Sequence, residues 1–320
     1  MNITVKKYEE SDFIQWEEFV DKSNNGTLFH LRKFINYHPS NKFIDNNLLF
    51  YKKNKIISVL PAVKKNKELI SHPGTSIGSF IILSDLSFAD ALEVVNQFVL
   101  YIRKNKFDRI QITQPPSIYN YKYSNYIDFA LLQNGFKYFK REITSILFLE
   151  SDNERNLQKF KPSHRTAVRK AQKSGLIIKQ SNNYEQFYSI LQKNLITRHG
   201  AKPTHTLDEI IKLNKLFPDR INLFCAYYNQ KMIAGVINFI TNNNVILAFY
   251  ISHDKKYQHL RPINLLFYKI FKWAIDKNFK IFDFGIFTVD EKPNLGLARF
   301  KENFGASGQF RDTYELIIND

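Results

Sequence analysis

The sequence predicts a mixed α/β protein of two lobes, because short apolar strands alternate with amphipathic helices and this order occurs twice along the chain. The length of 320 residues is enough for two ordinary domains with buried cores. A hydrophobic fraction of 44% and a charged fraction of 24% are typical of a folded globular protein. We assign residues 1–150 to the first lobe and 151–320 to the second, with no linker-like stretch near Glu150.

The first lobe is predicted from strand patterns and from one strongly periodic helix. Phe88, Leu92, Val95 and Val99 recur at helical spacing, which predicts a helix over 87–104, with Ser84 and Asp85 as capping residues ahead of it. The other elements expected here are strands at 48–52, 55–63, 79–83, 109–113 and 142–149, a hairpin turn at 52–55, and a helix at 127–133.

The second lobe begins with two basic helical segments and then shows a similar order of elements. Pro162 and Pro262 each suit the first turn of a helix, where the missing N–H costs nothing. The expected elements are strands at 176–179, 222–228, 232–240, 245–251, 281–284 and 309–317, and helices from 184, at 207–216, at 262–278 and at 297–303.

Several classes of protein are disfavoured by composition. Residues 1–12 lack the apolar stretch of a secretion signal, and no apolar run approaches the ~20 residues of a membrane span. We therefore expect a cytoplasmic protein. Cys225 is the single cysteine and lies in an apolar strand, which favours a core position. The histidines lack ligand spacing, so no metal site is expected.

The net charge of +16 points to an anionic partner such as nucleic acid, a nucleotide or an acidic membrane face. A second interpretation explains the charge equally well. The chain is rich in Asn and Ile as well as Lys, and an AT-rich genome produces that bias without any anionic partner. The places where basic residues cluster are therefore more informative than their sum.

One cluster of basic residues stands at the start of the second lobe. Arg165, Arg169 and Lys173 are spaced by four, so they share one face of the helix that begins at Pro162 and stops at Gly175. Arginines on one face can hold phosphates through bidentate hydrogen bonds. Spacing alone favours the plainer interpretation, a solvated basic face.

Two further motifs could carry chemistry. In Ile281–Gly285, Asp283 stands at the end of a buried strand, where it could orient an amine, accept a proton or cap a turn. In Gly296–Gly305, two glycines flank a short helix with Arg299, Phe300 and Lys301, and a lysine near a desolvated cleft can stabilise an oxyanion. Each motif is weak by itself, because such side chains are usually solvent-facing.

Taken together and in this order, the motifs resemble the Fem-type branch of the GNAT acyltransferase superfamily. The similar region runs from Lys159 to Ala306, through the stretches HRTAVRKAQKSGL, RHGAKP, FDFGIF and GLARFKENFGA. The resemblance implies two tandem GNAT-like lobes and transfer of an acyl or aminoacyl group to an amine. It also implies a catalytic group of Lys301, Phe300 and Asp283. Basic residues of the lobe would hold the phosphates of a nucleotide-linked acceptor, with Arg165 and Arg169 as candidates.

The resemblance leaves the donor open. GNAT enzymes bind the pyrophosphate of coenzyme A at a glycine-rich turn, whereas the corresponding segment here, Gln258–Asn264, has no glycine and contains a proline. We expect no permanently bound cofactor, and either aminoacyl-tRNA or acyl-CoA as donor. Transfer RNA is a partner in the first case. Further candidates for substrate binding are Arg198, His199, Tyr250, Arg261 and Arg299.

The favoured function is acyl or aminoacyl transfer to an amino group of a cell-envelope precursor or similar amino sugar, with an anionic small molecule as acceptor. Two alternatives remain. One is a coenzyme A-dependent N-acyltransferase on the same fold. The other is a non-catalytic nucleotide- or RNA-binding module that keeps only the basic surface. The sequence does not predict an oligomeric state.

Overall fold

The computed structural model describes residues 3–199 and 202–318, without the side chains of residues 197–199. The chain is a mixed α/β protein with two compact units. Unit 1 comprises Met1–Glu142 and Phe310–Asp320, and unit 2 comprises Ile143–Gln309. The sequence placed its boundary near Glu150 and kept the last residues in the second lobe, whereas this division lies at Glu142 and returns the C-terminal segment to unit 1. Among the described helices, none is long and apolar enough to cross a membrane.

Unit 1 contains two sheets and the helices that cover them. Its strands are β1 (Ile3–Lys7), β2 (Ile44–Asp45), β3 (Leu48–Lys52), β4 (Lys55–Leu60), β5 (Val63–Lys65), β6 (Glu68–Ser71), β7 (Ile81–Ile82), β8 (Arg109–Thr113) and the first part of β9 (Lys137–Phe148). Its α-helices are α1 (Phe13–Lys22), α2 (Arg32–Ile35), α3 (Phe88–Lys104) and α4 (Tyr126–Gln133), with 3₁₀ turns at Glu10–Asp12, Leu28–His30 and Ser117–Tyr119.

The core of unit 1 forms where α3 packs against the strands. One sheet has the order β1-β3-β4-β7, and the other contains β8-β6-β5-β2. The apolar face of α3 supplies Val94, Val95 and Phe98, all fully buried. The predicted helix is confirmed, but its N-cap is Ser87, whose hydroxyl accepts a hydrogen bond from the Asp90 N–H, and not Ser84 or Asp85.

Unit 2 is built on one mixed sheet. The strands of this sheet are the end of β9, β10 (Ile177–Gln180), β11 (Ile221–Tyr228), β12 (Lys231–Ile240), β13 (Val245–His253), β14 (Ile281–Ile286) and the start of β17 (Ser307–Ile317). Strands β15 (Thr288–Val289) and β16 (Lys292–Pro293) form a separate two-stranded sheet. The α-helices of unit 2 are α5 (Asn153–Lys159), α6 (Pro162–Gln172), α7 (Tyr184–His199), α8 (Leu207–Leu216), α9 (Pro262–Asp276) and α10 (Leu295–Glu302), with a 3₁₀ turn at Lys255–Leu260.

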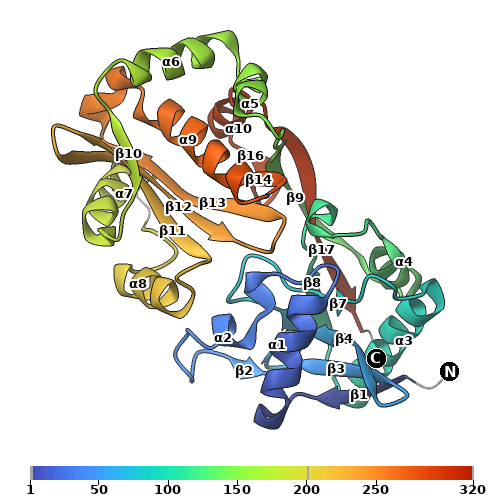
Figure 1. Ribbon diagram of the computed structural model, residues 1–320. Helices are drawn as coiled ribbons and strands as arrows, with labels where there is room; N and C mark the ends of the chain where they lie inside the picture. The colour runs from blue at the N-terminus through green and yellow to red at the C-terminus, as the bar shows by residue number, and fades with distance from the viewer. Residues whose placement is uncertain (1–2, 200–201, 319–320) are drawn as a thin grey trace. The chain divides into compact units, whose positions relative to one another are not determined.

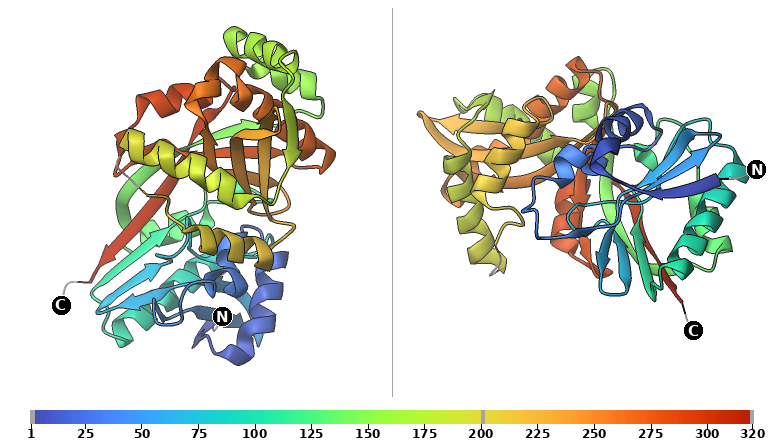
Figure 2. Two further views of the ribbon diagram at one scale, coloured as in Figure 1. Left: turned by 90° about the vertical axis from the view of Figure 1, so that its left-hand side faces the viewer. Right: turned by 90° about the horizontal axis from the view of Figure 1, so that it is seen from below.

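Helices cover both faces of the unit 2 sheet, as Figure 1 and Figure 2 show. Helix α9 lies against one face, where it buries Leu266, Phe267 and Phe271 in the main apolar cluster. Helix α7 packs on the opposite face. A side chain at Gly235 of β12 would meet the Phe187 ring of α7 at 2.5 Å, so only glycine allows this approach.

The sheet order β10-β11-β12-β13-β14-β9 contains one parallel pair, β13 with β14, and the chain between these two strands forms α9. The two strands pair from Val245 with Ile281 to Leu247 with Asp283, and the pairing ends there although β13 continues to His253. Parallel strands need a helical crossover of this kind. The free end of β13 and the start of α9 therefore lie together at one edge of the sheet.

Local sequence signals account for most elements of unit 2. Pro162 and Pro262 stand at the first turns of α6 and α9, and Gly175 after α6 has a φ of +74°, as expected. Asn229 and Gln230 form the β11–β12 turn with positive φ at both positions. Cys225 is fully buried with its Sγ 3.6 Å from Met232 Sδ, and burial raises the pKa of this thiol to about 12. The expectation of a core cysteine is confirmed.

Candidate functional site

A pocket of about 580 Å³ lies at the N-terminal end of α9. It is lined by the end of β13 (Ile251 and His253), the turn before α9 and one face of α10. The arginines Arg261 and Arg299 both line it, and none of the described residues in its wall is aspartate or glutamate. Pro262 has no N–H and the Asn264 N–H donates to the Arg261 carbonyl, so the first turn of α9 contributes the Ile263 N–H and the positive end of the helix dipole. The pocket is therefore suited to an anionic group.

The turn that forms the floor of this pocket is made without glycine. Arg261 is the N-cap of α9 and adopts the left-handed conformation, with φ +58° and ψ +43°. This is the region that glycine normally occupies. The lack of glycine in Gln258–Asn264 therefore does not prevent the tight entry into the helix, and it places a cation at the pocket instead.

His164 and Asn264 also line the pocket, and neither was among the residues predicted from the sequence. The Asn264 amide donates to His164 Nδ1 at 2.8 Å, which leaves Nε2 of the imidazole as the protonated nitrogen. Burial, with Arg261 nearby as the next cause, lowers the pKa of His164. The two residues are a hundred positions apart, so no local pattern signals the pair.

A second polar group links β14 to α10 through one glycine. The buried Asp283 carboxylate accepts hydrogen bonds from the Thr144 hydroxyl at 2.5 Å and from the Gly285 N–H at 2.6 Å. Lys301 Nζ donates to the carbonyl oxygens of Gly285 at 2.5 Å and Ile286 at 2.8 Å. Gly285 has a φ of +76°, a conformation that favours glycine. Asp283 and Lys301 are thus held in fixed positions on one turn of the backbone.

Lys301 is buried, with 1% of its surface exposed. Burial lowers the pKa of its ammonium group to about 8, and the negative charge of Asp283 opposes that shift. Its two hydrogen bonds to carbonyl oxygens use two of the three ammonium protons. The third proton can serve as a donor, and the lowered pKa allows the group to exchange protons near neutral pH.

Neighbouring residues on α10 face different surroundings. Phe300 and Arg299 line the pocket, and the Phe300 ring packs against Phe267 and Phe304. Lys301 extends to the backbone of β14 instead, and neither Lys301 nor Asp283 is part of the pocket wall. The structure therefore places Arg261, Arg299 and Phe300 in one pocket, and Asp283 with Lys301 in a buried group outside the wall of that pocket.

The remaining predicted residues lie elsewhere. Arg165 Nη1 donates to the carbonyl oxygens of Gln158 and Phe160, so this side chain holds the corner between α5 and α6. Arg169 is exposed on α6. The buried Tyr250 hydroxyl accepts from the His205 N–H at 3.0 Å and anchors the segment before α8. The side chains of Arg198 and His199 lie outside the described part of the structure.

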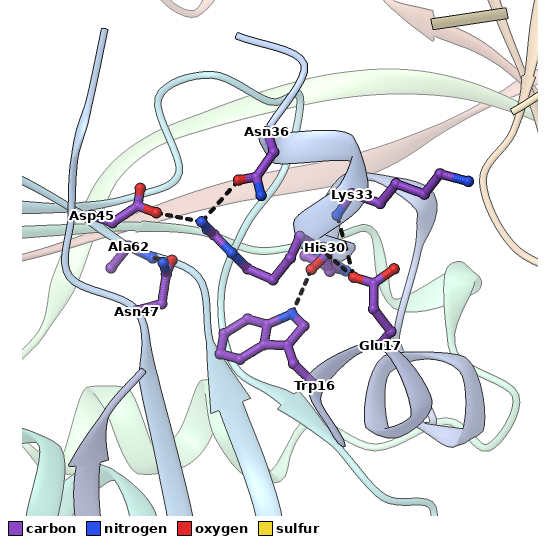
Figure 3. A network of polar contacts seen from close by, with 9 residues as sticks. Trp16, Glu17, His30, Lys33, Asn36, Asp45, Asn47 and Ala62 are labelled. Carbon is purple, nitrogen blue, oxygen red and sulfur yellow. Dashed lines mark hydrogen bonds and ion pairs between the residues drawn. The ribbon is translucent and has the colours of Figure 1, made fainter. Parts of the chain in front are cut away.

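Unit 1 contains a buried cation that the sequence did not reveal. Arg32 is 1% exposed and bonds Asp45 and Asn36 through Nη2, and these two residues flank the guanidinium in Figure 3. Its Nε and Nη1 have no hydrogen-bond partner among the described residues. Buried donors are normally paired, so these two can receive an oxygen acceptor. The nearby His72 is neutral, because burial lowers its pKa to about 3.

Comparison with known proteins agrees with the geometry. Residues 158–302 match the model of the acetyltransferase (GNAT) domain. The crystal structure of FemX is similar to this structure, with a TM-score of 0.75 and 14% sequence identity, and the match covers 98% of each chain. L-PGS from Bacillus licheniformis has a TM-score of 0.58 and 13% sequence identity, and the match covers 96% of this chain and 92% of that chain. A tandem GNAT protein from the clavulanic acid biosynthesis pathway has a TM-score of 0.56 and 8% sequence identity, and the match covers 100% of both chains.

No curated protein is similar enough in sequence to count as a match. The domain match covers Asp283, Lys301, the strand pair β13–β14 and all of the pocket wall except Asn303 and Phe304. The similarity to the tandem GNAT protein extends the fold to both units. Residues 158–302 thus match a GNAT acetyltransferase domain, and the whole chain has a fold of two GNAT-like lobes that is similar to the fold of FemX.

Proposed function

We propose that this protein transfers an acyl or aminoacyl group from a phosphate-bearing donor to an amine on a cell-envelope precursor or a similar amino sugar. The observation that carries the proposal is the acid-free pocket at the N-terminus of α9, with Arg261 and Arg299 in its wall. Two guanidinium groups and the Ile263 N–H fit the phosphates of either coenzyme A or a nucleotide-linked substrate.

The reaction is direct displacement. The acceptor amine attacks the carbonyl carbon of the ester or thioester, so a C–N bond forms and the C–O or C–S bond breaks. The amine loses a proton and the departing alcohol or thiol gains one. Lys301, held against Gly285 and Ile286, would stabilise the negative charge on the carbonyl oxygen with its third proton. Asp283 would hold the backbone turn that positions Lys301 and orient the amine.

Within unit 1, Arg32 is a candidate for binding an oxyanion. Its two unpaired N–H groups are preorganised, because Asp45 and Asn36 fix the other side of the guanidinium. A phosphate or carboxylate oxygen would complete its hydrogen bonding.

Coenzyme A-dependent N-acylation is the second candidate function. It is favoured by the left-handed Arg261, which forms the tight entry to α9 even though glycine is missing. Under this alternative the pocket holds the pyrophosphate of acyl-CoA, and the acceptor is a simpler amine.

The test measures binding and transfer separately. Coenzyme A, a tRNA pool and a UDP-linked amino sugar are titrated by calorimetry against the wild type and the Arg299→Ala variant. Arg103→Ala, an exposed arginine on α3, is the control. We expect at least one probe to bind about ten-fold more weakly to Arg299→Ala and equally well to Arg103→Ala. Transfer is then assayed with acetyl-CoA and with aminoacyl-tRNA. Binding without transfer from either donor would favour the non-catalytic module.

A further inference from the structure

A second pocket, of about 500 Å³, lies at the opposite end of α9 from the transfer site. Trp273 and Lys277, at the last turn of α9, and Phe279 just beyond it form one side. The opposite side comes from the end of β10, the turn between α8 and β11, and the β12–β13 connection. A helix of 15 residues is about 22 Å long, so the two pockets are separate sites.

The wall of this second pocket contains six neutral polar side chains and three charged ones, Asp219, Arg220 and Lys277. Five amides and one hydroxyl line it: Gln180, Ser181, Asn182, Asn214, Asn222 and Asn243. Amides donate and accept hydrogen bonds at the same time, which matches vicinal hydroxyl groups better than it matches phosphate. The C-terminal end of a helix carries the negative end of the dipole, and this disfavours anions. Arg220 and Lys277 in the wall oppose this effect of the dipole and Asp219 adds to it, so the case for a neutral ligand rests on the amides.

A buried amide, that of Asn238, lies beside Asn222 and outside the pocket wall. Asn238 on β12 pairs with Asn222 on β11 in register, and its Nδ2 donates to Asn222 Oδ1 at 3.2 Å. The Asn238 side chain is fully buried, and its Oδ1 has no partner among the described residues. An unsatisfied buried acceptor is uncommon in native proteins and calls for a donor such as a hydroxyl or a bound water.

Aromatic rings provide the apolar part of the pocket. Trp273 is half-buried and its ring packs 5.1 Å from Phe224 and 6.0 Å from Phe279, so its orientation is fixed. A pyranose ring has one apolar C–H face and a rim of hydroxyls, and it packs on a rigid aromatic face while amides bond the rim. A wall of amides beside a fixed tryptophan combines both requirements.

We propose that this pocket binds a neutral pyranose unit of a glycan, at a site distinct from the acyl-transfer pocket. The sugar hydroxyls bond the amides of the wall, and the apolar ring face covers Trp273. The site would hold a glycan-bearing molecule on unit 2 whichever donor the transfer reaction uses, so the proposal does not depend on the identity of that donor.

The probe is the trisaccharide of β-1,4-linked N-acetylglucosamine, titrated into the full chain and followed by tryptophan emission and by calorimetry. The other tryptophan, Trp16, is fully buried in unit 1, so a change in emission reports on Trp273. We expect saturable quenching with a dissociation constant of about 1 mM or tighter. Absence of binding at about 10 mM, by both methods, overturns the proposal.

Variants locate the binding. Asn182→Ala combined with Asn243→Ala removes two exposed amides, so the fold is retained, and affinity for the trisaccharide should fall about ten-fold. Asn41→Ala, an exposed asparagine of unit 1, should have no effect. Unchanged affinity in the double variant, loss of affinity in Arg299→Ala, or displacement of the sugar by inorganic phosphate would each contradict a neutral sugar site here. The last of these would indicate an anion site.

Discussion

Lys301 and Phe300 are adjacent in the chain, yet their side chains serve different parts of unit 2. Phe300 forms part of the wall of the α9 pocket, while Lys301 is buried against two carbonyl oxygens of β14. The plain alternative, a lysine in solvent, does not hold, because 1% of this residue is exposed.

The first prediction concerns the rate. Lys301→Ala should lower kcat about 10²–10³-fold while donor binding changes little, because a preorganised donor acts on charge that develops in the transition state. Lys301→Arg should be milder. The loss of two carbonyl partners also costs about 1–3 kcal/mol each in stability, so thermal unfolding is measured in parallel. Lys292→Ala, an exposed lysine on β16, is the control. Normal turnover in a folded Lys301→Ala variant would rule out the catalytic role.

The second prediction concerns pH. The pKa of Lys301 is lowered to about 8, mainly by burial. Since the protonated form is the donor, kcat should fall as pH rises through about 8, approaching ten-fold per unit. In Lys301→Arg the guanidinium stays protonated, so the fall in kcat above about pH 8 should disappear. Titration of the substrate amine would instead change kcat of both enzymes equally. The measurement is kcat of the wild type and of Lys301→Arg from pH 6 to pH 10. Identical pH profiles would refute the assignment of this pH dependence to Lys301.

At the scale of the element, the N-terminus of α9 combines a strained residue with a functional charge. Arg261 has a φ of +58°, so Arg261→Gly should relieve strain and stabilise the fold by about 1 kcal/mol while it weakens phosphate binding. Gln230→Gly, at φ +64° in the β11–β12 turn, is the matched control and should stabilise without any change in binding. Chemical denaturation and calorimetry with coenzyme A measure both effects. Equal binding in the two variants would mean that Arg261 does not contact phosphate.

At the scale of the whole molecule, most of the net positive charge belongs to unit 2. Unit 2 holds 25 basic and 13 acidic residues, so it carries +12 of the net +16. Lysine itself is spread evenly, with 16 in unit 1 and 18 in unit 2, and half of the asymmetry comes from the acidic residues, of which unit 1 has 17 and unit 2 has 13.

The fourth prediction uses that asymmetry. If tRNA binds unit 2, reversing Arg169, Lys170 and Lys173 to glutamate should lower affinity and reduce the slope of log K against log salt by about 2 to 3. The exposed trio Lys64, Lys65 and Lys67 of unit 1 is the matched control. Arg165 is left intact, because it holds the α5–α6 corner. Equal effects of the two triple variants, measured by fluorescence anisotropy, would mean that only bulk charge matters.

Elements with strong local signals could be predicted closely. Helix α3, the turn at Lys53 and Asn54, and the Pro262 start of α9 depend on periodicity or on backbone preferences that neighbouring residues decide. Helix α1 was not predicted, although it carried a readable pattern with Trp16, Phe19 and Val20 on its buried side. Strands β2 and β7 have two residues each, too short for any pattern to show.

By itself, the sequence determined the mixed α/β class, the core position of Cys225, and the motifs that carry Asp283, Arg299 and Lys301. Tertiary structure alone decided what those side chains contact. Thr144 reaches Asp283 across 139 positions and Asn264 reaches His164 across 100, while Phe310–Asp320 returns to unit 1 through the pairing of β17 with β8. Local preference acts over a few residues, whereas a buried polar group takes whichever partner the packing of distant elements brings within hydrogen-bond distance.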